Sequence, residues 1–337
     1  MSGVDLASRT LGGSVVAASD ESFGVKERLV DPAEPAFTPG TYDWRGEVVD
    51  GWETRRHAGP DGDWVIVRLG AAGLLHAVDV DTRFFSGNHP TACRVDACVL
   101  DQTADPTRTD VPWTTLVDMT VLKADAHNLL AVSDHRRWTH LRLHLESDGG
   151  VARLRAYGEV IPDPATWADV TVEVSGLEHG GRVEWCSDSF YSHACALIAP
   201  DRPRDMGDGW ETRRRRDVGP ETHDAVMISF AVPTDLRRLE IDTSYFVFNA
   251  SSEVSVLGSR ALPDDEHGWA LVPFDVPVLP RTLLAADARQ VFAVDARELT
   301  ALRVQAYPDG GIARVRALGT PTELGVQRLW TKWEESS

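Results

Sequence analysis

A six-residue motif that occurs twice constrains this sequence more than any other feature. Gly-Trp-Glu-Thr-Arg-Arg spans residues 51–56 and returns, letter for letter, at residues 209–214. The copies lie 158 positions apart (209 − 51 = 158), close to half of the 337-residue chain. An identical hexapeptide is improbable by chance, and a period of this length is a whole domain rather than a short solenoid unit. The motif therefore predicts a duplicated domain.

The duplication continues beyond the motif. Residues 63–69 align with residues 224–230 at an offset of 161, so a loop in the second copy is three residues longer. The same offset joins residues 80–82 to 241–243 and residues 148–153 to 309–314. Between the copies stand Pro162 and Pro164, which disfavour both helix and central strand. We expect two domains, spanning residues 1–162 and 163–337.

Each copy carries the pattern of a β-rich domain. Val65, Val67 and Leu69 share one parity, which indicates a strand with one buried face. Six similar segments follow and are bounded by Gly, Pro, Asn or Asp: 74–81, 93–100, 113–119, 129–133, 139–146 and 151–158. The Asp-Gly-Gly sequence at 148–150 predicts a hairpin between the last two. Together these segments predict an all-β fold, with one β-sandwich or jelly roll in each half. For the tail after residue 320, packing on the body and fraying both stay open.

Composition narrows the function classes. The net charge of −18 disfavours binding to nucleic acid. No run of 18 apolar residues predicts a membrane span, and no apolar leader is seen near residue 1. The four cysteines lack CxxC spacing and do not repeat between the halves, so we expect reduced thiols in a cytoplasmic protein.

The charged residues of the repeated motif are the first candidate site. Arg55 and Arg56 could bind a carboxylate, while the adjacent Glu53 could act as an acid or base. The alternative is a repeated salt-bridge lock, in which Glu53 and Arg55 pair on the surface of their own half. The matching candidates in the second copy are Glu211, Arg213 and Arg214.

Further polar residues gather where the strand 74–81 ends. Asp81 is a catalytic candidate, and Arg83, Asn88 and His89 follow it as candidates for substrate binding, with strand capping and turn formation as the alternative. His57 follows the first motif directly, and the catalytic candidates are therefore Glu53, His57 and Asp81.

Several of these residues are missing from the second copy. Arg215 stands in the place of His57, and an arginine does not release its proton at working pH. We therefore expect catalysis to depend on the first half. His223, in the longer loop of the second half, is a further binding candidate without a counterpart.

No metal or nucleophile motif is present. His140 and His144 share one strand face by parity, so a metal pair is conceivable, but a polar outward face is the more common reason for such spacing. The sequence has no HExxH and no G-x-S-x-G motif. We assign no metal ligands, and the cofactor stays open.

Residues 50–57, 63–70 and 78–88, with 206–214 in the second half, resemble the allantoicase family. The resemblance covers nearly the whole chain. It implies two tandem jelly-roll domains of the galactose-binding-like type, and hydrolysis of allantoate to (S)-ureidoglycolate and urea in purine degradation. It leaves a divalent metal open, and we expect a homo-oligomer. The alternative is a non-catalytic galactose-binding-like module that binds a small anionic or sugar ligand.

Overall fold

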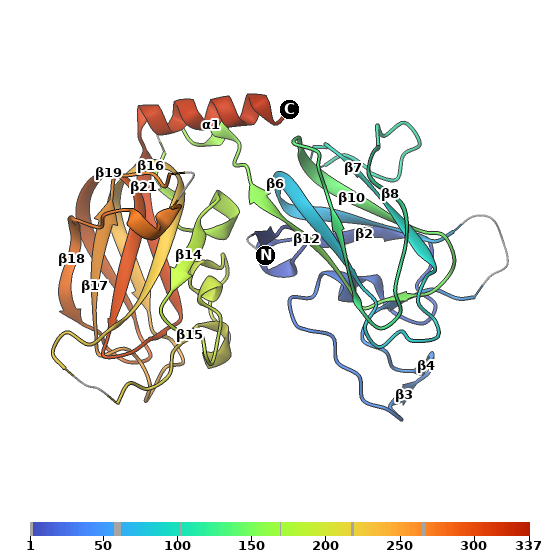
Figure 1. Cartoon of the computed structure of the whole chain (residues 1–337), viewed down its shortest axis with the longest axis horizontal. Helices are drawn as coiled ribbons and strands as arrows, with labels where there is room; N and C mark the ends of the chain where they lie inside the picture. Colours follow the sequence, from blue (N-terminus) through green and yellow to red (C-terminus); the bar gives the residue numbers. More distant parts are fainter. Residues whose placement is uncertain (1–2, 57–61, 102, 169, 217–218, 265–266) are drawn as a thin grey trace. The chain divides into compact units, whose positions relative to one another are not determined.

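The computed structural model describes residues 3–56, 62–101, 103–168, 170–216, 219–264 and 267–337. Its chain forms two compact units: the first ends at Ile161 and also includes Glu335–Ser337, and the second spans Pro162–Glu334. Both are built almost entirely from antiparallel strands, as the sequence predicts (Figure 1). His57 lies outside the described residues.

The first unit contains twelve described strands and two short 3-10 helices. They are β1 (Val4–Asp5), η1 (Arg9–Leu11), β2 (Ser14–Ala18), η2 (Lys26–Val30), β3 (Tyr42–Asp43), β4 (Gly46–Glu47), β5 (Trp52–Glu53), β6 (Trp64–Asp81), β7 (Ala92–Cys98), β8 (Thr114–Val121), β9 (His127–Ala131), β10 (Arg137–Leu145), β11 (Gly150–Val151) and β12 (Arg153–Val160).

Strand β6 belongs to both layers of the first sandwich. Its first half pairs with β2 and β10, and its second half pairs with β9 and β12. The sequence predicted two strands here, 63–69 and 74–81, because the apolar alternation breaks between them. The structure instead continues one strand through Gly70 and Gly73, where an added Cβ would lie within 2.5 Å of a neighbouring carbonyl oxygen.

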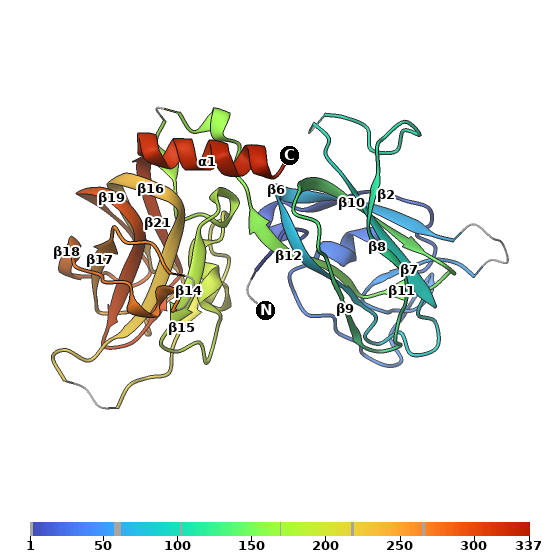
Figure 2. The ribbon, with the colours of Figure 1, turned by 45° about the horizontal axis from the view of Figure 1, so that its top comes forward.

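The predicted hairpin across residues 148–150 is wrong. Strands β10 and β12 do not pair with each other; both pair with β6, and β11 pairs with β5. Figure 2 labels β6, β10, β11 and β12 in the first unit. The two glycines serve close packing rather than a tight turn. Gly149 has a φ of +150°, and a Cβ on Gly150 would fall 1.9 Å from the ring of Phe85.

The second unit repeats this arrangement. Its elements are η3 (Pro164–Thr166), β13 (Val172–Glu173), η4 (Leu177–His179), β14 (Arg182–Cys186), η5 (Ala194–Ile198), η6 (Met206–Asp208), β15 (Trp210–Glu211), β16 (Asp224–Asp242), β17 (Glu253–Ser259), η7 (Trp269–Leu271), β18 (Val276–Leu283), β19 (Arg289–Tyr307), β20 (Gly311–Ile312), β21 (Arg314–Pro321) and α1 (Glu323–Glu335). The strand order β13-β21-β16-β19-β17-β18 matches the order β1-β12-β6-β10-β7-β8 of the first unit.

The tail after residue 320 forms helix α1, which the sequence analysis missed. The helix buries Leu329 in the core of the second unit, while Trp330 stays 42% exposed. The predicted core positions are confirmed, since Val65, Val67 and Val226 are fully buried. The prediction of a single buried face is wrong, because Ile66 and Ala225 next to them are buried as well. Of the described helices, none has the length and apolar character needed to cross a membrane.

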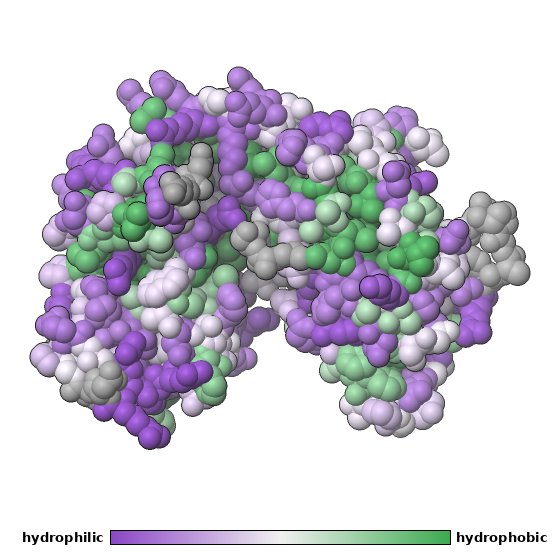
Figure 3. Space-filling view, viewed as in Figure 1, coloured by the Kyte–Doolittle hydropathy of each residue, from purple (hydrophilic) through white to green (hydrophobic). Residues whose placement is uncertain are grey.

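The tryptophan of each repeated motif is a core residue. Trp52 and Trp210 are fully buried, and each indole N–H donates to a backbone oxygen, of Asp20 and Asp188 respectively, at 2.8 Å. By contrast, hydrophilic side chains cover much of the visible surface, interrupted by apolar patches (Figure 3). The motif therefore anchors its tryptophan inside and carries its charged residues outward.

Candidate active site

Glu53 is placed by the short sheet at one end of the first sandwich. It faces Gly150 across the β5–β11 pair, directly after the buried Trp52. The next residue, Thr54, receives a hydrogen bond from the Gly149 N–H at its Oγ1 and donates its own N–H to the Gly149 carbonyl. Backbone and core contacts thus hold this carboxylate in one position.

Asn88 completes the first polar pair of the site. Its Nδ2 donates to Glu53 Oε1 at 2.6 Å, and its backbone oxygen accepts from the Gly150 N–H at 2.8 Å. Burial raises the pKa of Glu53 above its usual range, against the opposing effects of the Asn88 hydrogen bond and the positive charge of Arg56. A half-buried carboxyl with a raised pKa suits acid–base chemistry.

Two hollows of about 590 and 570 Å³ open beside this pair. Both are lined by Arg56, Gly87, Asn88 and Asp148. The first hollow also contains Glu53 and Arg55 on its wall, and the second contains His89. Their shared lining makes them two parts of one depression. The structure therefore brings together five of the residues that the sequence singled out in the first half, which are Glu53, Arg55, Arg56, Asn88 and His89.

The two arginines of the motif have different surroundings. Asp20 binds Arg55 twice: its carboxylate accepts from the Arg55 backbone N–H at 2.8 Å and lies 3.4 Å from Nε. The described residues offer the Arg56 guanidinium no hydrogen bond and no ion pair. Arg55 thus forms a salt bridge with Asp20, and not with Glu53 as the structural alternative expected, whereas Arg56 is available to an anion.

Asp81 and Arg83 lie apart from the depression and bind each other. Asp81 accepts from the Arg83 backbone N–H at 2.9 Å and from its Nε and Nη2, and Arg83 also contacts Glu34. Neither residue lines the two hollows. A buried aspartate that is already saturated by an arginine is better suited to holding this loop than to proton transfer, although their predicted roles stay untested.

Of the two histidine candidates in the first half, only His89 lies among the described residues. His57 lies outside the described residues, so its predicted acid–base role stays a prediction. His89 lines the second hollow, and its Nδ1 atom is buried without a hydrogen-bond partner among the described residues. A buried ring nitrogen without a partner has lost its hydrogen bond to water and has gained none in return. A bound ligand could supply that hydrogen bond.

The second unit keeps the Glu–Asn pair of the first, but its arginines are held in ion pairs. Asn249 Nδ2 donates to Glu211 Oε1 at 2.6 Å, as in the first unit. Arg214 lies 2.9 Å from Asp309, whose other oxygen accepts from the Arg215 backbone N–H. The arginine that is available in the first unit is therefore held by a buried carboxylate in the second.

The remaining candidates of the second unit do not form a matching pocket wall. Arg213 lies near Asp188, with its Nε 3.7 Å from the carboxylate, and stacks over the ring of Phe190. His223 contacts Gln305 at 2.9 Å and packs against Tyr307, so its described contacts lie away from Glu211.

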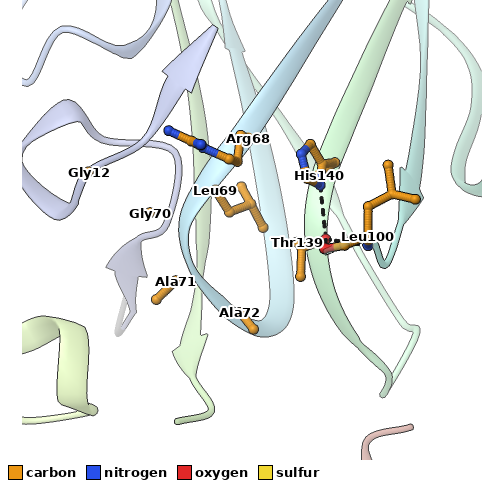
Figure 4. A pocket seen from close by; sticks show the side chains of 9 residues that line it. All are labelled: Gly12, Arg68, Leu69, Gly70, Ala71, Ala72, Leu100, Thr139 and His140. Carbon is orange, nitrogen blue, oxygen red and sulfur yellow. Dashed lines mark hydrogen bonds between the residues drawn. The ribbon is translucent and has the colours of Figure 1, made fainter. Parts of the chain in front are cut away.

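No metal centre emerges from the described part of the chain. It contains no group of three or more His, Cys, Asp or Glu residues that could hold an ion. His144 lies 3.0 Å from Asp96, whereas His140 is buried beside Thr139 and Arg68 in a separate small pocket (Figure 4). The prediction that His140 faces solvent is therefore wrong, because neighbouring segments bury its side chain.

Asp148 lines the depression but was not predicted from the sequence as a site residue. Asp148 lines both hollows, and its counterpart Asp309 forms the ion pair with Arg214. The repeated Asp-Gly-Gly sequence was the available signal, but it was interpreted only as a turn.

Comparison with known proteins agrees with this duplicated architecture. A family model described as the allantoicase repeat matches residues 4–161 and 172–322. A protein of Nocardia farcinica named probable allantoicase is 45% identical over 328 residues, covering 95% of this chain and 94% of that protein. A probable allantoicase of Streptomyces coelicolor is 42% identical over 347 residues, covering 98% of this chain and 89% of the relative.

A solved structure supports the same conclusion at the level of the fold. The crystal structure of allantoicase from Saccharomyces cerevisiae matches with a TM-score of 0.79 and 28% identity, covering 94% of this chain and 92% of that one. The family model and the relatives together span nearly the whole sequence. This chain belongs to the allantoicase family.

Proposed function

We propose that this member of the allantoicase family hydrolyses allantoate to ureidoglycolate and urea, and that the depression of the first unit is its active site. The observation that carries the location is the contrast between the units. Both hold the Glu–Asn pair at 2.6 Å, but only the first presents, beside that pair, an arginine free of any described ion pair.

Allantoate bears one carboxylate and two ureido groups on the same carbon. Arg56 donates hydrogen bonds to the carboxylate in a bidentate contact, because the guanidinium fork matches its two oxygens. The Oδ1 of Asn88 accepts from a ureido N–H, since the Nδ2 of the same amide already holds Glu53. Asp148 lines the same space.

Glu53 is the acid–base group of this proposal. As the new C–O bond forms, its carboxylate accepts a proton from water; as the C–N bond breaks, the same proton passes to the departing urea nitrogen. One water is consumed and no net proton is lost, so the step balances. The raised pKa of Glu53 favours this exchange, because it makes the carboxylate a stronger base than an exposed glutamate. His57 would assist as the sequence analysis predicts.

The test is urea release from allantoate by the purified full-length chain, with and without a chelating agent. We expect urea and ureidoglycolate in equal amounts. Loss of activity in the chelator that returns with a divalent ion would establish a metal requirement. Saturable allantoate binding without any urea would instead support the non-catalytic module.

We also propose a cytoplasmic homo-oligomer. The four cysteines carry free thiols, which suits a reducing compartment. Large apolar side chains such as Trp44 and Phe248 are 85% and 96% exposed, and such residues are common where subunits meet. Light scattering of the purified protein would reveal a single-chain mass if the oligomer proposal is wrong.

A further inference from the structure

The second unit contains an aromatic pocket on the outer face of its sheet that the proposed reaction does not use. It has a volume of about 490 Å³, within the usual range of small-molecule sites. Its lining is Glu184, Trp185, Met227, Trp269, Ala270, Val272, Phe274 and Arg303. None of these residues lines the depression around Glu53 in the first unit.

The sheet itself aligns the floor of this pocket. Trp185 of β14 faces Met227 of β16, and Met227 faces Arg303 of β19, so the three side chains form one cross-strand row. The register of β14 shifts between Val183 and Trp185, which makes Glu184 the extra residue of a β-bulge. Trp269 of η7 and Phe274 add two further aromatic walls.

The two charged residues of the pocket, Arg303 and Glu184, form no ion pair with each other. The Nε atom of Arg303 is buried without a hydrogen-bond partner, and the described residues give its guanidinium no ion pair. Glu184 is fixed at one oxygen, which accepts from Ser229 Oγ at 2.6 Å. A cation without a partner and an oriented carboxylate therefore border the same aromatic space, which is costly unless something else binds them.

The first unit has a different arrangement at the same position. Arg142, the counterpart of Arg303, stacks over Trp113 at 4.4 Å and lies 3.1 Å from Asp96. Its Nε, like that of Arg303, lacks a hydrogen-bond partner among the described residues, so the difference between the two arginines is the ion pair. The second unit has Leu257 in the place of Asp96 and Trp185 in the place of Ala17. Since the fold is stable with the closed arrangement, the open aromatic version is not a requirement of the sandwich.

We propose that this pocket binds a planar nitrogen heterocycle of the nucleobase type, with ring N–H and C=O groups. The tryptophans and Phe274 stack on the ring faces, as aromatic side chains do with bases. Arg303 donates to a ring carbonyl oxygen, and Glu184 accepts from a ring N–H. The opposite charges of these two side chains select a ligand with both kinds of group.

The test uses the full-length protein and saturation-transfer NMR, with hypoxanthine as the probe. Benzoate, which lacks N–H groups, and galactose, which is not planar, are the comparison ligands. We expect saturable binding of hypoxanthine and at least about a tenfold rise of its Kd in Trp185→Ala and in Glu184→Gln. Trp330→Ala, which removes a 42% exposed indole outside the pocket, is the matched control and leaves the Kd unchanged.

Three outcomes overturn the proposal. The first is no saturable hypoxanthine signal from wild-type protein up to the solubility limit of the probe. The second is equal binding of benzoate or galactose. The third is a Trp330→Ala variant that weakens binding as much as Trp185→Ala. Light scattering accompanies each variant: a change of mass in Trp185→Ala, with no heterocycle bound by wild type, would assign this face to a protein contact instead. Urea release is not the readout, so this proposal can fail independently of the proposed function.

Discussion

Replacing Arg56 by alanine should weaken the binding of allantoate while leaving the fold intact. The guanidinium has no hydrogen bond or ion pair among the described residues, so its removal should change the free energy of unfolding by no more than about 0.5 kcal/mol. A charged contact to a bound carboxylate is worth about 2–5 kcal/mol when one partner is removed. Because the depression is open to solvent, we expect the lower part of that range, which corresponds to a rise in KM of roughly 30- to 300-fold.

The matched variant in the second unit should behave in the opposite way. Arg214 lies 2.9 Å from Asp309, which is only 2% exposed, so Arg214→Ala leaves a buried carboxylate with one partner fewer. The arginine itself is half exposed, and we therefore expect a loss of about 1–2 kcal/mol and a Tm lower by several degrees. The KM for allantoate should stay at the wild-type value.

The assay is steady-state urea release, together with thermal unfolding of each variant. A wild-type KM in Arg56→Ala combined with early melting would show that Arg56 is a structural lock. An equal rise of KM in both variants would show that both units contribute to binding. Arg55→Ala is a useful third variant: because Asp20 already holds Arg55, we expect a smaller effect on KM than for Arg56.

The remaining predictions concern catalysis, pH and stability. Glu53→Gln should lower kcat by about 10²- to 10⁴-fold, whereas Glu211→Gln at equal Tm should keep full turnover; the reverse result would refute the assignment. Because burial raises the pKa of Glu53, kcat/KM should fall on acidification at a higher pH than an ordinary glutamate would give, as a pH–rate profile would show. Burial, with the nearby Arg68, lowers the pKa of His140 to about 4. As the pH falls, the unfolded chain therefore binds a proton on this histidine near pH 6.5, whereas the folded chain binds it only near pH 4. Stability is lost across that interval, and urea unfolding of His140→Ala should lack this component. Arg153→Leu, which leaves Asp50 without its buried partner, should cost about 3–5 kcal/mol in chemical denaturation.

The β architecture was predictable because its signals are local. The alternation of Val65, Val67 and Leu69 marks the side of the strand that faces the core, and its recurrence after residue 224 marks the duplication. Strand partners were not predictable in the same way. The Asp-Gly-Gly sequence at 148–150 has the local chemistry of a hairpin, yet its glycines are needed where backbone approaches Asn88 and the ring of Phe85.

Helix α1 was missed for a related reason. Its apolar residues are few, and it gains its place by burying Leu329 against the second sandwich, a tertiary contact that a sequence window does not contain.

The sequence predicted which residues lie in the candidate site better than it predicted what each of them does. Glu53, Arg56 and Asn88 were found because the motif repeats and because polar residues follow a strand end. Only coordinates separate Arg55, which Asp20 holds, from Arg56, which nothing described holds. Asp81 was a reasonable catalytic candidate by residue type, but its contact with Arg83 depends on a turn geometry that spacing alone does not fix.

The long strand β6 has a consequence for how the protein is made. It pairs with β2 near the start of the chain and with β12 (Arg153–Val160) at the end of the first unit. Its second half therefore lacks one neighbour until the ribosome has delivered residue 160, and contacts this distant in sequence form slowly. The nascent first sandwich stays open on that side during most of its own synthesis. It can then close as a unit while the second half is still being translated.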